Sequence, residues 1–329
     1  MQRVVGAVLV GVAGFLLVVA ALARFYLPGQ VVKFPLNEYS VTRLAGSHVS
    51  YFSESSVKEI TGVNAEAVNT TQGDVSSGSS STAVWSSVLG VFDTTNGNLT
   101  NNRKAITYDD SREAFDRRTG ELVNCQSCGT EVDKKKVRFS GQGAVWPIGV
   151  KQQTYQVYDT TLLRAVPAVY AGTKTIDGFK TYEFIENINN QQFGTIKVPG
   201  SLVGMSPPSV TLPEYLTARI VTYVDPATGA PIKEVETQNQ SLINPATGVT
   251  ALVRFNGTLT STPKSVASAI SNARPLDNKI TWVEDLAPLL ALIIGALCLV
   301  IGLVMLAAGG GREDLEWEFS QQQAGAQAT

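Results

Sequence analysis

Hydrophobic and polar positions divide the chain into two long apolar runs and a mixed part between them. Val4–Leu22 contains nineteen residues without a charge, and Leu286–Ala308 contains twenty-three. An α-helix rises about 1.5 Å per residue, so about 20 apolar residues cross the hydrocarbon core of a bilayer. The pattern therefore predicts transmembrane helices at residues 4–23 and 286–308, with residues 24–285 held to the membrane at both ends.

The part between the two runs has the sequence pattern of β-hairpins. Four turn signals begin with Asp or Asn and have Gly four positions later, namely Asp93–Gly97, Asp116–Gly120, Asp225–Gly229 and Asn244–Gly248. The first side chain can cap the turn, and Gly adopts the left-handed conformation that closes it. The predicted fold class is α+β, mainly β, with an antiparallel hairpin-built sheet or barrel-like domain between two transmembrane helices.

Three segments depart from the hairpin pattern. Gly73–Ser81 is rich in Gly and Ser and is expected to be a mobile surface loop. Pro263–Ala273 has apolar residues at spacings of three and four, which predicts a helix. Met205–Pro213 contains three prolines and is expected to be a loop.

Two crossings return the chain to its starting side. We therefore expect residues 1–3 and the acidic, polar tail 309–329 in the cytoplasm, and residues 24–285 on the exoplasmic side of the plasma membrane, with the cell wall as an alternative location. Ala21-Leu22-Ala23 also resembles a cleavage site, so a removed signal peptide stays open as an alternative. The first apolar run exceeds the 7–15 residues usual for such a peptide, which favours a retained anchor.

Composition narrows the function. The net charge is −2 and the pI about 5.6, which gives no reason to expect nucleic acid as a partner. The chain has one histidine, His48, so a metal centre built from several histidines is excluded. Nucleophile-elbow, phosphate-loop and nucleotide-binding motifs are absent from the sequence. We therefore expect no catalytic, cofactor-binding or metal site, and no enzyme.

The sharpest local motif is Cys125-Gln-Ser-Cys128. In an exported domain, two cysteines at this spacing are expected to pair, whereas in the cytosol the spacing would indicate redox or metal chemistry. A zinc site needs a second pair of ligands, and the remaining Cys298 lies in the second apolar run. The prediction is a structural disulfide between Cys125 and Cys128.

Two charged stretches have simple surface interpretations. The residues from Asp109 to Arg118 form a dense mixed-charge patch, which we interpret as a solvated face, with phosphate or ion binding as the alternative. Lys134–Lys136 is a short basic run and is expected to guard an exposed strand edge against aggregation.

Several stretches resemble a known family in order and content. They are Phe25–Lys33, Asp116–Cys125, Lys151–Thr161, Val198–Leu202 and Tyr223–Gly229. Through them the chain resembles, along nearly its whole length, the actinobacterial PorA porin family, with Trp146-Pro147 where that family usually has Phe-Pro. The resemblance implies an envelope protein of a mycolic-acid-type bacterium and channel-forming activity in the cell wall.

Two terminal helices around a β-rich domain are also similar in architecture to the class B scavenger receptors, whose ectodomain holds a lipid-conducting tunnel. The leading hypothesis is therefore binding or conduction of a hydrophobic or amphiphilic envelope molecule, such as a lipid or glycolipid. A cell-wall channel and a non-catalytic envelope scaffold are the alternatives. Expected partners are the lipid bilayer and, as open alternatives, further copies of the chain or other envelope proteins. The ligand-binding residues stay unknown because the strand register is unknown.

Overall fold

The structure is a computed structural model that describes residues 2–27, 31–97 and 105–326. The chain divides into two compact units, one made of Met1–Val32 with Asp277–Thr329 and the other of Lys33–Leu276. The first unit contains the apolar terminal helices. The second contains the strands and is called the β unit below.

Among the described residues, two helical stretches are long and apolar enough to cross a membrane, by length and composition. The first is α1 (Gln2–Phe25). The second runs without a break from α3 (Pro263–Thr281) through a π-helical turn, η2 (Trp282–Leu286), into α4 (Ala287–Ala326). Both predicted spans thus lie within helices, and helical structure continues into the tail.

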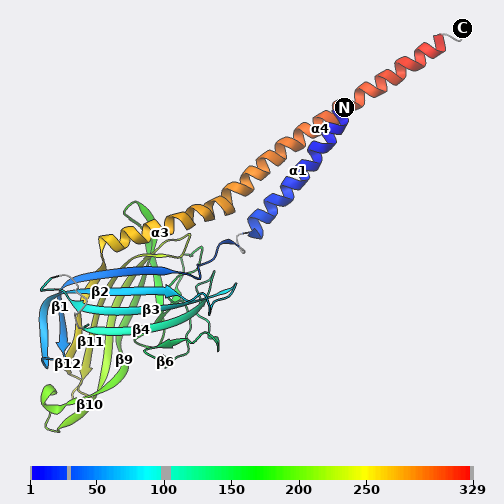
Figure 1. Cartoon of the computed structure of the whole chain (residues 1–329). Helices are drawn as coiled ribbons and strands as arrows, with labels where there is room; N and C mark the ends of the chain where they lie inside the picture. The colour runs from blue at the N-terminus through cyan, green and yellow to red at the C-terminus, as the bar shows by residue number, and fades with distance from the viewer. Residues whose placement is uncertain (1, 28–30, 98–104, 327–329) are drawn as a thin grey trace. The chain divides into compact units, whose positions relative to one another are not determined.

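Helices α1 and α4 pack side by side through small residues (Figure 1). Gly6, Ala13 and Ala20 are buried on α1 at intervals of seven residues, and Gly295 and Gly302 are seven apart on α4. A Cβ added to Gly6 would lie 2.9 Å from the carbonyl oxygen of Gly302. The backbones therefore approach closely, and the seven-residue interval is that of helices wound with a left-handed supercoil.

The described residues of the β unit form one antiparallel 12-stranded sheet, which confirms the predicted fold class. The strands are β1 (Tyr39–Ser53), β2 (Lys58–Gly73), β3 (Thr82–Asp93), β4 (Thr107–Asp116), β5 (Glu131–Val132), β6 (Lys135–Lys136), β7 (Tyr155–Asp159), β8 (Arg164–Ile176), β9 (Phe179–Pro199), β10 (Ser209–Val224), β11 (Pro231–Ile243) and β12 (Thr250–Ser261). Their order across the sheet is β6-β5-β4-β3-β2-β1-β12-β11-β10-β9-β8-β7. Most neighbours in the chain are therefore neighbours in space, as hairpins require.

Three of the four predicted turns form as expected. The amide nitrogens of Gly120, Gly229 and Gly248 donate to the carbonyl oxygens four residues earlier at 2.9, 2.9 and 2.8 Å, and each Gly has positive φ. At the fourth turn, Asp93 accepts a hydrogen bond from the nitrogen of Thr95 at 2.9 Å as a capping residue, but the nitrogen of Gly97 donates to the carbonyl oxygen of Thr94 at 3.1 Å, three residues earlier. The loop predicted up to Pro213 is wrong in part, because β10 already begins at Ser209. The register shifts just after Pro213, and proline is tolerated in a strand at such an irregularity.

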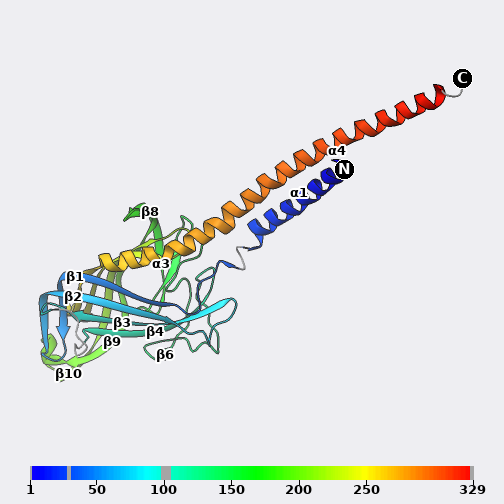
Figure 2. The ribbon, with the colours of Figure 1, turned by 45° about the horizontal axis from the view of Figure 1, so that its top comes forward.

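The sheet is curled, so distant strands face each other across its inner side (Figures 1 and 2). The side chain of Arg254 on β12 pairs with Glu214 on β10, and its charge also acts on Asp109 on β4, four strands away in the sheet order. Single bridges then connect β4 with the edge strand β7: they join β4 to Leu122, Glu121 to Gln142, and Gln142 to β7. The segment between β4 and β7 therefore closes the curled sheet at one end.

Aromatic side chains fill the closed end. Trp85 and Phe115 stand edge to face at 4.8 Å, and Phe139 packs on Tyr158 at 4.7 Å. On the other side of the same end, Trp146 packs on Phe184 at 4.2 Å. Large aromatic rings bury much apolar area, so these groups anchor the end of the sheet against the connecting segment.

The outer face of the sheet is polar over β10, β11 and β12. Cross-strand rows there join exposed Thr217, half-buried Asn239 and exposed Asn256, and place Arg219 beside Thr237. A strand wall that faces lipid carries an apolar outward band instead. The face is therefore suited to water, and the helices are the part of the chain suited to the bilayer.

The predicted helix before the second span is confirmed and extends further than expected, to Thr281. Within the β unit, its apolar residues Val266, Ile270 and Ala273 pack on Phe179 and Ile232 at the ends of two hairpins. This stripe of residues at spacings of three and four explains why the segment forms an amphipathic helix.

Candidate functional site

The middle of the inner face is open to water, although the same face is buried at its ends. Glu186 on β9, Ile220 on β10 and Glu236 on β11 lie in one cross-strand row and therefore share the inner face. Glu186 is buried, whereas Ile220 and Glu236 are only half-buried. An apolar side chain that points inward and still contacts water shows that water reaches the concave side of the curled sheet at this point. We call this concave side the hollow.

Carboxyl groups gather along one side of this hollow. Burial raises the pKa of Glu186 to about 8, with further contributions from the charges of Glu234, Asp159 and Glu236. Burial, followed by the charge of Glu234, raises the pKa of Glu236 to about 8 as well. Near neutral pH these side chains hold protons, and a neutral carboxyl group both donates and accepts hydrogen bonds. They do not converge on one point: the described residues contain no group of three or more His, Cys, Asp or Glu placed to hold a metal ion.

A second polar group lies further along the hollow. The register of β12 against β11 shifts at Arg254, which lies between the paired residues Val253 and Phe255. Such a bulge redirects a side chain. Arg254 reaches Glu214, which is 10 % exposed, in a close ion pair. On β4, Asp109 is exposed, and only part of its carboxyl group is shielded from water. This partial desolvation and the charge of Asp133 raise its pKa, while Arg254 opposes the shift.

Apolar side chains line the wall made by β1, β2, β3 and β12. The buried members are Leu44, Val49, Val63, Ala65, Ala67, Val91, Phe255 and Leu259. Leu259 lies directly beside Glu236 in the register of β11 and β12, so this cluster adjoins the row of carboxyl groups. Partly buried residues packed on the cluster, such as Leu89, add apolar surface next to polar groups, which suits a molecule with an apolar and a polar part.

The closed end contains polar atoms without a partner. Glu113 accepts a hydrogen bond from the backbone nitrogen of Ala144 at 3.2 Å and is otherwise enclosed, so burial raises its pKa. Within the described ranges, the buried oxygen atoms Tyr158 Oη and Gln142 Oε1 at this end, and Asn69 Oδ1 on β2 beside Leu89, have no hydrogen-bond partner. Buried polar groups are usually paired, so these three oxygen atoms retain unused capacity for hydrogen bonds.

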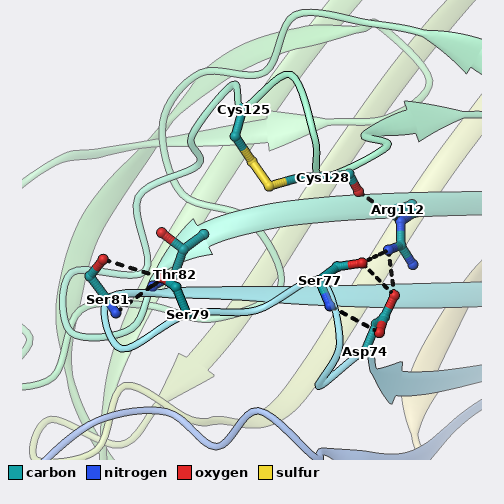
Figure 3. Close-up of a disulfide and its surroundings, with 8 residues drawn as sticks. All are labelled: Asp74, Ser77, Ser79, Ser81, Thr82, Arg112, Cys125 and Cys128. Carbon is teal, nitrogen blue, oxygen red and sulfur yellow. Dashed lines mark hydrogen bonds and ion pairs between the residues drawn. A yellow bond between two sulfur atoms is a disulfide. The ribbon is translucent and has the colours of Figure 1, made fainter.

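The cysteine pair lies in the loop beside β4 (Figure 3). It is on the outer side of the sheet, because Cys128 packs on Val84 and Ala114, whose side chains point away from those of Trp85 and Phe115. Cys125 and Cys128 lie at disulfide-bonding distance, with Cα atoms 5.4 Å apart, in a loop rather than at a helix start. Cys128 is 4 % exposed and packs on Val84 and Ala114. This environment suits the predicted structural staple, and Cys298 lies in α4 as expected.

The mixed-charge patch does not form one face. β4 sends Asp109 and Glu113 to the inner side, and Asp110 and Arg112 to the outer side. The interpretation as a single solvated surface is therefore wrong, because side chains alternate along a strand and Glu113 is buried. Lys135 and Lys136 form β6, the last strand of the sheet, where the sequence predicts an edge.

The inner carboxyl groups were not predicted from the sequence. One sequence feature could have indicated Glu186. Along β9, Phe184, Glu186 and Ile188 are two residues apart and therefore lie on the same face, with the charged residue between two apolar ones. A charged residue in a strand usually faces water. Only the pairing of β9 with β10 shows that Glu186 points to the inner face.

Comparison with known proteins assigns the family. The family model described as Porin PorA matches residues 5–304, which include both apolar helices and the whole sheet. A search of curated proteins gives no significant match. A porin family suggests a non-enzymatic protein of the cell envelope. Since the match covers most of its length, the chain belongs to the PorA porin family.

Proposed function

We propose that this envelope protein binds an amphiphilic molecule with an uncharged, hydroxyl-rich head, such as a glycolipid, in the hollow of its curled sheet. The observation that carries the proposal is the half-buried state of Ile220 and Glu236 on the inner face. A filled core leaves no such surface in the middle of a sheet.

The chemistry of the hollow favours this class of ligand. Protonated Glu186 and Glu236 can exchange hydrogen bonds with hydroxyl groups. Asp109 disfavours an anionic head by charge repulsion, and the positive charge of Arg254 is already compensated by Glu214. The half-buried apolar side chains of Ile220 and Leu89 then contact the hydrocarbon part. An anionic phospholipid is therefore expected to bind more weakly than a neutral glycolipid.

The apolar helices favour a location of the β unit, and of any molecule bound to it, close to a membrane. We infer that both anchors are retained in the plasma membrane and that the β unit lies on the exoplasmic side. There, lipids of the envelope are within reach of a water-exposed domain, which the polar outer face favours.

Native mass spectrometry of the full chain in detergent, incubated with a neutral glycolipid or with phosphatidylglycerol, tests the proposal. Ile220→Trp fills the middle of the hollow and should abolish glycolipid binding. Thr217→Trp, on the outer face of the same strand, is the matched control and should bind as the unchanged chain does. Equal binding by both variants would sink the proposal, as would a preference for the anionic lipid.

The family name favours channel formation as a second candidate. Planar-bilayer recordings of the full chain separate the two, since discrete conductance steps are expected of a channel alone. If ions pass through the hollow, Asp109→Asn should change cation selectivity, because this exposed carboxyl group lies on the inner face of β4. A chain that shows neither bound lipid nor conductance would instead support the scaffold hypothesis.

A further inference from the structure

One arginine connects two loops on the outer side of the sheet (Figure 3). Arg112 on β4 donates from Nε to the carbonyl oxygen of Cys128 at 2.9 Å. From Nη2 it donates to Asp74 Oδ2 at 2.6 Å and to Ser77 Oγ at 3.0 Å. Its Nη1 donates to Ser86 at 3.1 Å. Because all three nitrogen atoms of the guanidinium group donate hydrogen bonds, the group is fixed in one position.

The first of these loops is the ring made by the two cysteines. The backbone nitrogen of Cys128 donates to the carbonyl oxygen of Cys125 at 3.3 Å, and the Cys128 side chain is buried on Val84 and Ala114. A bond between the sulfur atoms therefore holds the carbonyl group of Cys128 in the place where Arg112 binds it.

The second is the segment between β2 and β3, residues 74–81, which we call the Gly/Ser loop. Asp74 organises its start by accepting hydrogen bonds from the hydroxyl groups of Ser76 and Ser77 at 2.6 and 2.8 Å. These bonds and the ion pair to Arg112 hold the pKa of Asp74 below its usual range. The loop is thus ordered by polar contacts, although its composition predicts a mobile segment.

We propose that the oxidation state of Cys125 and Cys128 controls the order of the Gly/Ser loop through Arg112. A dithiol reductant supplies two electrons and two protons, so the disulfide becomes two thiols and the reductant becomes a disulfide. The freed ring then releases the carbonyl group of Cys128, Arg112 loses its Nε partner, and its contact with Asp74 becomes mobile. This inference is independent of the hollow and of the molecule that the hollow binds.

Hydrogen–deuterium exchange of the full chain in detergent, with and without dithiothreitol, tests the coupling. Reduction should speed exchange of residues 74–81 by about tenfold, the effect expected when one charge-assisted hydrogen bond is lost. The double variant Cys125→Ser and Cys128→Ser should exchange like the reduced chain. Unchanged exchange in the Gly/Ser loop, with faster exchange confined to residues 125–128, would overturn the proposal.

Two arginines that hold the same loop provide a matched pair. Arg112→Gln should make the loop exchange quickly in both redox states. Arg117 binds the carbonyl oxygens of Ser79 and Ser80, each at 3.4 Å, without a contact to the cysteines. Arg117→Gln should therefore loosen the loop while preserving the difference between oxidised and reduced protein. Free thiols at both positions in protein from intact cells would also refute the proposal, because no oxidised state would then exist.

Discussion

At the scale of single residues, the carboxyl groups of the hollow make the folding stability of the β unit depend on pH. Burial raises the pKa of Glu186 and Glu236 from 4.5 to about 8, so the folded chain binds protons that the unfolded chain releases. The associated stability is fully present below about pH 4.5 and is lost as the pH rises through about 8. The slope is about 1.4 kcal/mol per pH unit for each group that titrates.

We therefore expect the unfolding temperature of the β unit, followed by circular dichroism, to fall between about pH 5 and about pH 8. Glu186→Gln should flatten this fall because it removes one of the titrating groups. Glu121→Gln changes an exposed residue and should leave the profile unchanged. A profile that is equally steep in all three proteins would contradict the assignment of these pKa shifts.

The element scale is where the sequence was most informative. The hairpin turns and both apolar helices follow from local rules, since turn chemistry and apolar length need no knowledge of distant residues. The short strands β5 and β6 and the bridges at Gln142 could not be predicted, because they depend on contacts across the closed end. The register likewise decides that Glu186 points into the hollow, and local sequence carries no register.

The repeated turn allows a comparison between two glycines of the same design. A Cβ at Gly229 would lie 2.2 Å from the carbonyl oxygen of Trp146, whereas Gly248 has no neighbour within 4 Å, and both have positive φ. Gly248→Ala should cost about 1 kcal/mol, the price of a left-handed alanine. Gly229→Ala should cost several times as much, since the backbone at Trp146 must also move. Chemical denaturation measures both, and equal losses would refute the close contact.

The helix pair allows a second comparison. Gly302 lies against the backbone of Gly6, while Gly11 on α1 has no neighbour within 4 Å. Gly302→Leu should separate the helices and lower resistance to sodium dodecyl sulfate, followed by circular dichroism, because small residues permit close packing in membranes. Gly11→Leu is the matched control and should behave as the unchanged chain does. A similar loss in both variants would argue against this packing.

At the scale of the whole molecule, topology decides which compartment the hollow serves. With both anchors retained, the mature chain should begin at or near Met1, and tags on both ends should resist added protease in intact cells. Cleavage of both tags would reverse the proposed orientation, and cleavage of one tag alone would contradict two crossings. Amino-terminal sequencing that starts at Arg24 would replace the first anchor by a signal peptide.

The close pairing of α1 and α4 has a consequence for the folding stability of the sheet, whose strands lie between the two helices in the sequence. When Gly6 and Gly302 stay in contact, an unfolded β unit is a closed ring and has fewer conformations than an open chain. In the chain-entropy treatment of cross-links, closing a ring of more than one hundred residues lowers the entropy of the denatured state and so raises its free energy by about 5 kcal/mol. The membrane helices thus act as a non-covalent cross-link, which stabilises a fold that they need not contact.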